Sequence, residues 1–402
     1  MTQDRFICLA GKNNIAVNVL RYLLQNRNMD YKIGIVCNRT ETGIDGWQKS
    51  FRKYAKTMGI PEYSLEEMYE MENLVFISLE FDQIVKPECF RSARLYNIHF
   101  SLLPAYKGMY TAAIPLINGE KKTGVTFHCI DAGIDTGDII KQKEFSIEAS
   151  YTVRDVYKCY IKYGTELVLE CIDDVIRGNV NATKQPATGS SYYSRKAIDY
   201  KNLHIDLMQT AEKIANQIRA FNFREYQMPK VYDEAIIDTL ILDTATRKKP
   251  GTILEKSEAG MVISTIDYDI VLYYDRFGEC MEACACGNLH IVQEICKVRK
   301  HISERSDEGW TPLIVATYHG NMEVVKYLIS IGADIHDKNY NGTNLLMYAK
   351  EVFLRDGNTE LFQMLYDMGL DVEENDDYGK NVIDYLKEDG YELKDIIPDN
   401  YI

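Results

Sequence analysis

The sequence predicts an α/β protein with a parallel sheet, followed by a small antiparallel β domain and an all-α repeat tail. Three observations predict this organisation. Strand-like and helix-like runs alternate over the first part of the chain, which is typical of a parallel sheet covered on both faces. Between residues 229 and 274 the runs are short and strand-like, and from residue 275 a period of 33 residues appears. We therefore expect three domains, at residues 1–185, 186–274 and 275–402.

The first three strands are expected at residues 5–10, 31–37 and 73–79, with helices between them. No GxGxxG motif follows the first strand, so a dinucleotide-binding fingerprint is absent. The turn of Gly11, Lys12 and Asn13 opens the first helix, and its backbone amides predict either a phosphate site or a simple helix cap. In open parallel sheets, ligands bind at the carboxyl ends of the strands, where the residues after the third strand lie.

The central block begins with a strand at residues 95–100 and continues through a loop, an apolar helix and a strand at residues 123–130. Asn97 and His99 are two residues apart, so both side chains leave the strand on one face. A Gly-rich turn after the second strand can bring Asp135 back towards them. An amide, an imidazole and a carboxylate that converge can polarise a carbonyl and move a proton. The alternative is a hydrogen-bonded strand end beside an ordinary turn.

A long helix with an apolar stripe is expected at residues 152–177. A turn-rich connection at residues 185–193 leads to a helix at residues 211–221. The pattern then favours five short strands, at residues 230–232, 235–242, 251–256, 260–266 and 269–274. These strands predict the small antiparallel β domain.

The tail carries an internal repeat. Gly287 and Gly309 recur 33 residues later as Gly320 and Gly342, and a Thr-Pro-Leu turn at residues 311–313 opens the middle copy. A third copy spans residues 342–371 and holds about four inserted residues, expected at residues 352–357. This period and this turn are typical of ankyrin repeats, in which each helix pair buries its apolar face against its neighbours.

The net charge of -14 is concentrated in the tail, because residues 275–402 carry 25 acidic and 12 basic residues, whereas residues 1–274 carry 35 and 34. Nucleic acid is therefore not expected as the main partner, since phosphate binding needs a basic surface. No apolar run approaches membrane-spanning length, no signal-peptide pattern is present, and the ten cysteines form no CxxC pair. We expect a cytoplasmic protein with reduced thiols, no metal site and no membrane contact.

Residues 1–230 resemble the formyltransferases that use 10-formyltetrahydrofolate. This family includes methionyl-tRNA formyltransferase, glycinamide ribonucleotide formyltransferase and the N-formyltransferases of nucleotide-linked amino sugars. The resemblance rests on three motifs in one order: Asn-Ile-His at residues 97–99, Ser-Leu-Leu-Pro-Ala-Tyr-Lys-Gly at residues 101–108, and Asp-Ala-Gly-Ile-Asp-Thr-Gly-Asp at residues 131–138. It implies a Rossmann-like catalytic domain, 10-formyltetrahydrofolate as the cofactor, and Asn97, His99 and Asp135 as the catalytic residues.

The chemistry of these side chains agrees with those roles. In formyl transfer a neutral amine attacks the formyl carbon, which creates an oxyanion and a positively charged nitrogen. Asn97 exchanges only hydrogen bonds and suits the oxyanion. His99 titrates near neutrality and suits proton transfer, while Asp135 would orient His99 or a water and stabilise the cationic ring.

For the cofactor, the resemblance implies that the pterin ring meets backbone groups after the third strand and in the Gly-rich turn. These residues are Leu79, Glu80, Phe81, Asp82, Gln83, Ile84, Asp131 and Gly133. His128 lies on an apolar strand and is expected to be a core histidine or one that supports the site.

The acceptor site is predicted from residues after the Leu-Leu-Pro bend and from guanidinium and aromatic side chains that suit a pyrophosphate and a stacked base. With Gly11, Lys12 and Asn13, the predicted acceptor residues are Tyr106, Lys107, Arg219, Phe221, Arg224 and Tyr226. The alternative for the last four is packing between domains. This segment resembles the sugar formyltransferases more than the tRNA enzyme, and the resemblance also implies a homodimer through the middle domain.

A chain with an ankyrin tail most resembles a dTDP-3-amino-3,6-dideoxyhexose N-formyltransferase of lipopolysaccharide O-antigen synthesis, with the D-glucose sugar favoured. The alternatives are dTDP-4-amino-4,6-dideoxyglucose, methionyl-tRNA or glycinamide ribonucleotide as acceptor, and, outside enzymes, an ankyrin interaction protein. The tail is expected to bind a protein or a small ligand. Its exposed-side aromatics are Trp310, Tyr318, Tyr340 and Tyr348, and Trp310 is a candidate second ligand site whose alternative is a structural role.

Overall fold

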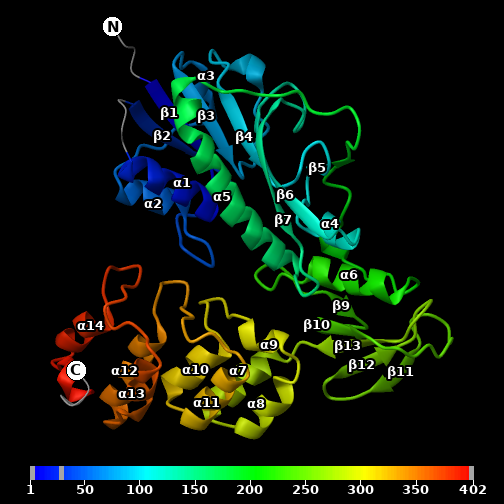
Figure 1. The fold of residues 1–402 in the computed structure, drawn as a ribbon, viewed down its shortest axis with the longest axis vertical. Helices are drawn as coiled ribbons and strands as arrows, with labels where there is room; N and C mark the ends of the chain where they lie inside the picture. Colours follow the sequence, from blue (N-terminus) through cyan, green and yellow to red (C-terminus); the bar gives the residue numbers. More distant parts are fainter. Residues whose placement is uncertain (1–4, 27–30, 398–402) are drawn as a thin grey trace. The chain divides into compact units, whose positions relative to one another are not determined.

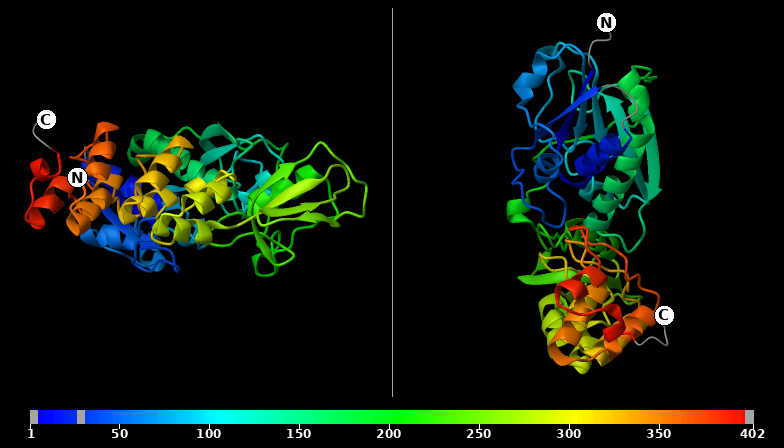
Figure 2. Two further views of the ribbon diagram at one scale, coloured as in Figure 1. Left: turned by 90° about the horizontal axis from the view of Figure 1, so that it is seen from below. Right: turned by 90° about the vertical axis from the view of Figure 1, so that its left-hand side faces the viewer.

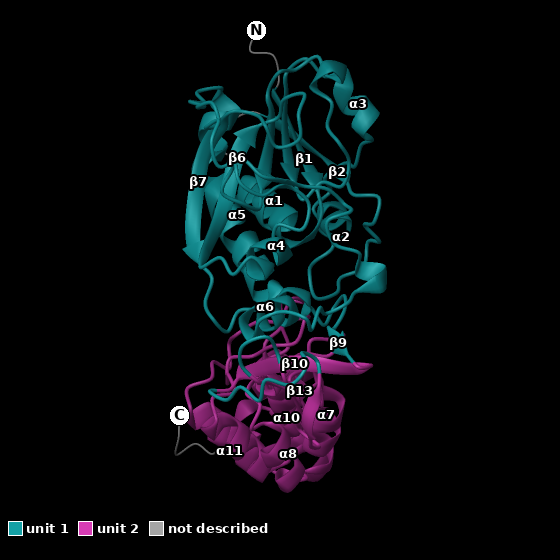
Figure 3. Cartoon of the chain, turned by 90° about the vertical axis from the view of Figure 1, so that its right-hand side faces the viewer, with its two compact units in different colours: residues 1–231, 243–251, 265–268 teal, residues 232–242, 252–264, 269–402 magenta. Residues whose placement is uncertain are grey.

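The computed structural model describes residues 5–26 and 31–397 (Figure 1). The chain forms two compact units: residues 1–231, 243–251 and 265–268 make unit 1, and residues 232–242, 252–264 and 269–402 make unit 2 (Figure 3). The expectation about a signal peptide falls on residues 1–4, which lie outside the described residues. No helix in the described part of the chain has both the length and the apolar character needed to span a bilayer.

Unit 1 is built on a six-stranded sheet in the order β2-β1-β3-β4-β6-β7. The strands are β1 (Arg5–Gly11), β2 (Tyr31–Cys37), β3 (Leu74–Leu79), β4 (Leu95–His99), β6 (Lys122–Cys129) and β7 (Ile139–Ser146). The first four are parallel, whereas β6 runs antiparallel to β4, and β7 antiparallel to β6. The α/β class is confirmed, but the expected parallel sheet is mixed at this edge. Sequence analysis missed β7 because its outer residues are charged rather than apolar.

Helices lie on both faces of this sheet. The helices of unit 1 are α1 (Asn13–Gln25), α2 (Phe51–Thr57), α3 (Leu65–Tyr69), α4 (Ala113–Ile117), α5 (Val153–Arg177) and α6 (Ala211–Phe221), with short 3-10 turns η1 (Pro87–Cys89) and η2 (Tyr200–Asn202). Met68 of α3 packs in one buried cluster with Leu95 of β4. On the other face α5 approaches β4 closely, because a Cβ at Gly164 would lie 3.5 Å from Ile98 Cγ1. Strand alternation therefore puts Asn97 on the face opposite α5.

A small parallel ladder joins two distant segments beside the end of β4. Strand β5 (Lys107–Gly108) pairs with β8 (Tyr192–Tyr193), and Met109 N donates to Tyr193 O at 2.9 Å. Tyr106 N also donates to Ser191 Oγ at 2.7 Å. This ladder brings the turn-rich connection predicted at residues 185–193 next to the loop after β4.

Unit 2 begins with an antiparallel sheet, as expected from the sequence. Its strands β10 (Glu234–Ile241), β11 (Ile253–Lys256), β12 (Gly260–Ile263) and β13 (Ile270–Tyr274) follow the order β11-β12-β13-β10. A short strand β9 (Lys230–Val231) ends the first segment of unit 1.

The rest of unit 2 is helical, and its helices stack in neighbouring pairs (Figure 2). They are α7 (Phe277–Cys286), α8 (Leu289–Ile295), α9 (Lys300–Ser303), α10 (Pro312–His319), α11 (Met322–Ser330), α12 (Leu345–Asp356), α13 (Glu360–Asp367) and α14 (Val382–Glu388), followed by the turn η3 (Leu393–Asp395). One buried apolar cluster runs from Cys280 to Ile397. A stack whose core is shared between neighbours is the arrangement that the 33-residue period predicts.

The Thr-Pro-Leu turn works as a helix start. The Thr311 side chain accepts from Ile314 N at 3.4 Å, and Pro312 occupies the first helical position, where no amide hydrogen is needed. The four inserted residues of the third copy lengthen a helix, since α12 has 12 residues where α10 has 8. Both helices end at a left-handed glycine, Gly320 and Gly357.

Candidate active site

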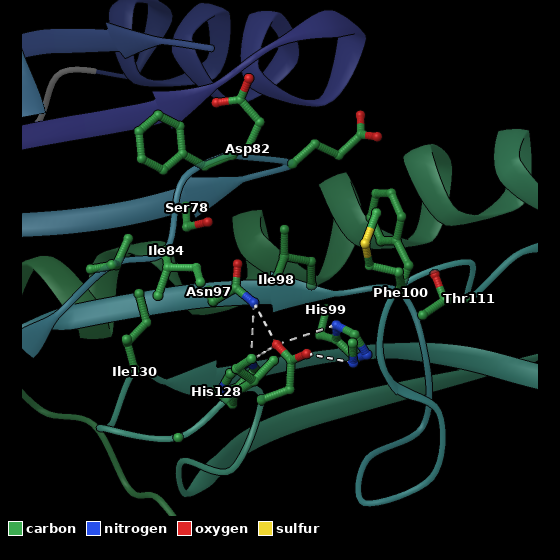
Figure 4. A pocket seen from close by; sticks show the side chains of 18 of the residues that line it. Ser78, Asp82, Ile84, Asn97, Ile98, His99, Phe100, Thr111, His128 and Ile130 are labelled. Atoms are coloured by element: carbon green, nitrogen blue, oxygen red, sulfur yellow. Dashed lines mark hydrogen bonds and ion pairs between the residues drawn. The ribbon is translucent and has the colours of Figure 1, made fainter. Parts of the chain in front are cut away.

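A cavity of about 570 Å³ opens at the carboxyl ends of β3 and β4 in unit 1. Its wall comes from the ends of these strands, the segment after β5, the end of β6 with the turn that follows, and two residues near β8. Figure 4 shows Asn97, His99 and His128 close together on this wall.

The three side chains singled out by the sequence come together here. Asp135 Oδ1 lies 3.5 Å from Asn97 Nδ2 and 3.4 Å from His99 Nδ1. His99 is buried, and the Asp135 side chain is 13% exposed. A carboxylate with so little water around it interacts strongly with its neighbours. The structure thus unites an amide, an imidazole and a carboxylate, and their catalytic roles stay predictions.

Asp135 is held by partners from distant parts of unit 1. Its backbone has a left-handed φ of 54°, and its Oδ2 accepts from Gly108 N at 2.9 Å. Gln185 Nε2 donates to the carbonyl oxygens of both Asp135 and Gly137 at 2.8 Å. Gly137 has no substitute in this turn, because a Cβ there would lie 1.8 Å from Cys129 O. The turn therefore fixes the direction of the carboxylate.

His128 belongs to the site as a support for Asn97. It lies opposite Asn97 in the β4–β6 register, and its Nδ1 faces Cys129 O at 2.8 Å. Nδ1 therefore carries the proton, and Nε2 accepts from Asn97 Nδ2 at 3.1 Å. Burial lowers the pKa of His128, which keeps this ring neutral and its Nε2 free to accept.

His99 has a different environment, because both of its nitrogens face acceptors. Nε2 donates to Tyr106 O at 2.8 Å, and Nδ1 faces Asp135 Oδ1. Such a ring can hold a proton on each nitrogen, with the second proton shared with the carboxylate. The geometry therefore suits uptake of a proton from a reacting group next to Nδ1.

The link after β3 forms one flank of the cavity. Of the predicted cofactor residues, those that line it are Glu80, Phe81, Asp82, Gln83, Ile84, Asp131 and Gly133. Asn38 braces this link, since its side chain donates to Glu80 O at 2.8 Å and accepts from Asp82 N at 3.3 Å. Leu79 was also predicted to contact the cofactor, but it does not line the cavity. It is fully buried and its carbonyl oxygen accepts from Lys12 N at 3.3 Å, so it is a core residue.

Tyr106 positions His99 through its backbone. Its hydroxyl donates to Glu120 at 2.5 Å, and its ring stacks on Tyr193 with centroids 5.7 Å apart. Its side chain is therefore engaged in the fold rather than in the cavity. Lys107 lies in β5 and does not line the cavity either, although its neighbour Gly108 does.

The second group of predicted acceptor residues is divided by the structure. Arg219 donates to the carbonyl oxygens of Ala149 at 3.2 Å and Tyr151 at 3.1 Å, so it clamps the segment before α5. Phe221 is buried against Tyr200. Tyr226 is 58% exposed and lines a second cavity of about 310 Å³. Arg219 and Arg224 line neither of these two cavities, so packing is the better account of Arg219.

The turn at the start of α1 also lies outside both cavities. No side chain caps α1 there, and Asn13 Nδ2 donates to Tyr157 OH at 3.4 Å. Gly11 must be glycine, because a Cβ would lie 1.9 Å from Leu79 O. The phosphate site predicted for Gly11, Lys12 and Asn13 stays a prediction.

Sequence reasoning missed several residues of the main cavity: Ser78, Phe100, Met109, Thr111, Tyr192 and Arg195. Ser78 was within reach, since β3 ends one residue later and pairs with β4 at Asn97. Tyr192 and Arg195 carry no local signal, because only the β5–β8 ladder brings them here. In the described part of the chain no cluster of His, Cys, Asp and Glu is arranged to hold a metal ion.

The aromatic residues of the tail pack on one another. Trp310 is half-buried, with its ring centroid 5.4 Å from Tyr318 and 5.2 Å from Tyr348 in edge-to-face contacts. Tyr348 was expected on the exposed side, but it is buried and its hydroxyl accepts from Asn339 Nδ2 at 2.8 Å. The sequence period alone did not show that α12 turns this residue inward.

An amide, an imidazole and a carboxylate gathered in one cavity at the carboxyl ends of the strands suit an enzyme that polarises a carbonyl group and moves a proton. Comparison with protein families agrees. Residues 51–172 match the family Formyl transferase, residues 197–278 match Formyl transferase, C-terminal domain, and residues 280–376 match Ankyrin repeats in three copies. The chain belongs to the formyltransferase family and carries ankyrin repeats.

Two solved structures resemble about two thirds of this chain. WlaRD, a sugar 3N-formyl transferase solved with dTDP and 5-N-formyl-THF, is 42% identical with a TM-score of 0.63, covering 68% of this chain and 99% of its own. The N-formyltransferase from Helicobacter canadensis, solved with folinic acid and dTDP-3-aminofucose, is 42% identical with a TM-score of 0.61, covering 67% and 98%.

Among curated proteins, methionyl-tRNA formyltransferase of Fervidobacterium nodosum is 28% identical over 292 residues, which is 67% of this chain and 91% of the relative. The corresponding enzyme of Clostridioides difficile is 33% identical over 202 residues, 48% of this chain and 63% of the relative. The family expectation from the sequence motifs is therefore confirmed, and the choice between acceptors depends on the site.

Proposed function

We propose that this enzyme transfers the formyl group of 10-formyltetrahydrofolate to the 3-amine of a dTDP-linked 3-amino-3,6-dideoxyhexose. The observation that carries the proposal is the convergence of Asn97, His99 and Asp135 in one cavity. The sugar class is supported by the two solved relatives, which are 42% identical and were studied with dTDP ligands.

The proposed chemistry follows from the side chains. When bound, 10-formyltetrahydrofolate supplies an activated formyl group to the attacking amine. Asn97 donates a hydrogen bond to the formyl oxygen as negative charge develops on it, with His128 fixing the orientation of the amide. His99 accepts the proton that leaves the amine, and Asp135 stabilises the resulting cation. The proton finally replaces the formyl group on the leaving nitrogen, so that charge and atoms balance.

The cofactor fits the flank formed after β3 and by the turn after β6. Residues 81–84 and also Asp131 and Gly133 line the cavity there. A pterin ring needs hydrogen-bond donors and acceptors of the kind that a main chain supplies. We therefore expect the ring to lie on this flank, with its one-carbon group directed towards Asn97.

The second cavity suits the base of the acceptor. It is lined by aromatic residues, including Tyr110, Tyr200, Phe223 and Tyr226. Met109 and Thr111 line the main cavity, and Tyr110 between them lines the second, so the two cavities border the same segment. Arg195 is the only lysine or arginine among the residues that line the main cavity. We expect it to hold the pyrophosphate between sugar and base.

Further expectations belong to this proposal: a cytoplasmic location, a homodimer, and a role in supplying formylated sugars for lipopolysaccharide O-antigen. The ankyrin tail is expected to bind a protein or a small ligand. Methionyl-tRNA is the second candidate acceptor, because the curated relatives are methionyl-tRNA formyltransferases. Against it stands the nearly neutral charge of residues 1–274, with 35 acidic and 34 basic residues.

The test is an acceptor panel with the purified full chain and 10-formyltetrahydrofolate. The panel contains dTDP-3-amino-3,6-dideoxyglucose, its C4 epimer, dTDP-4-amino-4,6-dideoxyglucose, glycinamide ribonucleotide and methionyl-tRNA. Tetrahydrofolate release is measured together with the mass of the product. Turnover of a 3-amino sugar above all others supports the proposal, whereas preferred turnover of another acceptor, or of none, overturns it.

A further inference from the structure

Glu80 is a buried carboxyl group for which the chemistry above has no use. It follows β3 directly and lines the main cavity, and its backbone has a left-handed φ of 58°. Residues other than glycine adopt this conformation at a cost, and such positions cluster where a ligand is held. Its carbonyl oxygen is fixed by Asn38, so the strained backbone is braced in place.

The carboxyl group is held by a directed set of hydrogen bonds. Tyr157 on α5 donates its hydroxyl proton to Glu80 Oε1 at 2.6 Å. That hydroxyl accepts from Gln48 Nε2 at 3.2 Å and from Asn13 Nδ2 at 3.4 Å. Because amide nitrogens can only donate, both of these bonds use the lone pairs of the hydroxyl oxygen. The single hydroxyl proton is therefore donated to Glu80. Three segments of unit 1 thus fix the position of one carboxyl oxygen.

The other oxygen, Glu80 Oε2, is buried and has no hydrogen-bond partner among the residues that the structure describes. Burial raises the pKa of Glu80 to about 7, with the charge of Lys12 and the hydrogen bond from Tyr157 acting in the opposite direction. An unpaired buried carboxyl oxygen disfavours the folded state, because the donors that water supplied are lost. An unpaired carboxyl oxygen that is kept in a cavity wall at this cost in stability indicates that a bound ligand supplies the missing hydrogen-bond donor.

The position of Glu80 at the end of β3 indicates which ligand its free oxygen would contact. In the β3–β4 register, Ser78 pairs with Asn97 and Leu79 with Ile98, and Glu80 directly follows β3 at the end of the sheet where β4 ends at His99. Tyr157, which holds Glu80, lies 5.8 Å from Phe223 between ring centroids, and Phe223 lines the aromatic cavity. Glu80 therefore lines the cavity of the reaction centre and is linked through Tyr157 to the wall of the cavity proposed for the acceptor base. The proposed cofactor flank begins with the next residue, Phe81.

We propose that Glu80 is a specificity-determining residue for the acceptor, whose free oxygen accepts a hydrogen bond from the ring hydroxyl next to the reacting amine. Tyr157 is a positioning residue that acts through Glu80. The inference rests on the proposed function, because it requires an acceptor that is an amino sugar. It goes beyond that function by naming the part of the sugar that is recognised and the residue that recognises it.

The experiment compares Glu80→Gln and Tyr157→Phe with the control Glu88→Gln, an exposed carboxylate in the same connection that lies outside both cavities. KM is measured for the 3-amino sugar and separately for 10-formyltetrahydrofolate. We expect both test variants to raise the acceptor KM about ten-fold or more, while the cofactor KM changes by less than about two-fold. The control should leave both values unchanged.

A second measurement uses an acceptor that lacks the neighbouring hydroxyl. Wild-type enzyme should show the raised KM with this deoxy acceptor, and Glu80→Gln should add nothing further, since the partner is already gone. An unchanged wild-type KM with the deoxy acceptor overturns the inference even if a variant does not fold. Equal changes of both KM values in the variants also overturn it, because they indicate a structural role. If wild-type enzyme turns over no amino sugar, the proposed function itself fails.

Discussion

The cavity of unit 1 and the aromatic cluster of unit 2 both contain side chains of kinds that often bind ligands. They differ in whether these side chains find all their partners within the protein. In the cluster, Trp310, Tyr318 and Tyr348 satisfy one another by edge-to-face packing. In the cavity, His99 has an acceptor at each nitrogen, and Glu80 Oε2 has no partner in the described part of the chain. Groups that complete each other stabilise a fold, whereas groups that still need a proton or a donor indicate a site.

The largest effect on kcat is expected for Asp135 and His99, whose proposed interactions with the reacting groups form only during the reaction. Asp135→Asn and His99→Gln should each lower kcat by roughly two to four orders of magnitude, because the first removes the charge that stabilises the ring and the second removes the ring. Single-turnover rates with a 3-amino sugar measure this. Thermal unfolding serves as the control for folding. A loss of less than about ten-fold in both variants would contradict the roles.

The next effect is a pH dependence of stability that Glu80 imposes. Because burial raises its pKa from 4.5 to about 7, the folded state binds a proton that the unfolded state has released between these values. Stability should therefore fall as pH rises through this window and stay level above it. Glu80→Gln should remove this loss, and at about pH 8 it should be more stable than wild type by up to roughly 3 kcal/mol.

The pH dependence of stability can be followed for unit 1 within the full chain. Trp47 and Trp310 are the two tryptophans, so in a Trp310→Phe background the fluorescence of Trp47 reports unit 1. Urea unfolding at about pH 5 and about pH 8 then compares Glu80 with Gln at this position. Parallel pH dependences in the two proteins would show that Glu80 titrates normally.

A smaller effect is expected in the aromatic cluster. Trp310→Ala should lower the free energy of unfolding of unit 2 by about 2 kcal/mol, since a half-buried ring loses its contacts. Tyr378→Ala is the matched control, because that ring is 70% exposed in the same unit. Titration with dTDP decides the separate prediction of a second ligand site. Loss of one bound nucleotide per chain on Trp310→Ala supports such a site, and unchanged stoichiometry dismisses it.

The smallest effect separates two arginines. Arg195→Ala should raise the acceptor KM about ten-fold, equivalent to about 1.4 kcal/mol, with little change in melting temperature. Arg219→Ala should lower the melting temperature and leave the acceptor KM unchanged, since this guanidinium binds main-chain carbonyls before α5. The reverse result would assign the pyrophosphate to Arg219, as its neighbourhood in the sequence first indicated.

Local patterns were sufficient for much of the fold. The strand predicted around Asn97 agrees closely with β4, and the helix predicted at residues 211–221 agrees with α6, because each has a regular apolar period. Strand β7 escaped because its polarity is that of a solvated edge. The inserted residues of the third repeat were detected by spacing alone, but only the structure shows that they extend α12.

The site divides in the same way. That Asn97 and His99 share a face follows from the two-residue period of a strand, and no other part of the chain can change it. Glycine spacing was likewise enough to reveal the stacked helices of the tail. These features depend on neighbours in the chain, and the sequence by itself determined them.

Only the tertiary structure decided which charged groups are already paired. Arg219 finds its carbonyl partners about 70 residues away, and Glu80 finds Tyr157 at a separation of 77 residues. Partners at such distances leave no trace in the residues around either group. Whether an arginine clamps the fold or faces a cavity therefore depends on packing, because desolvation and hydrogen bonding are set by whichever segments the fold brings together.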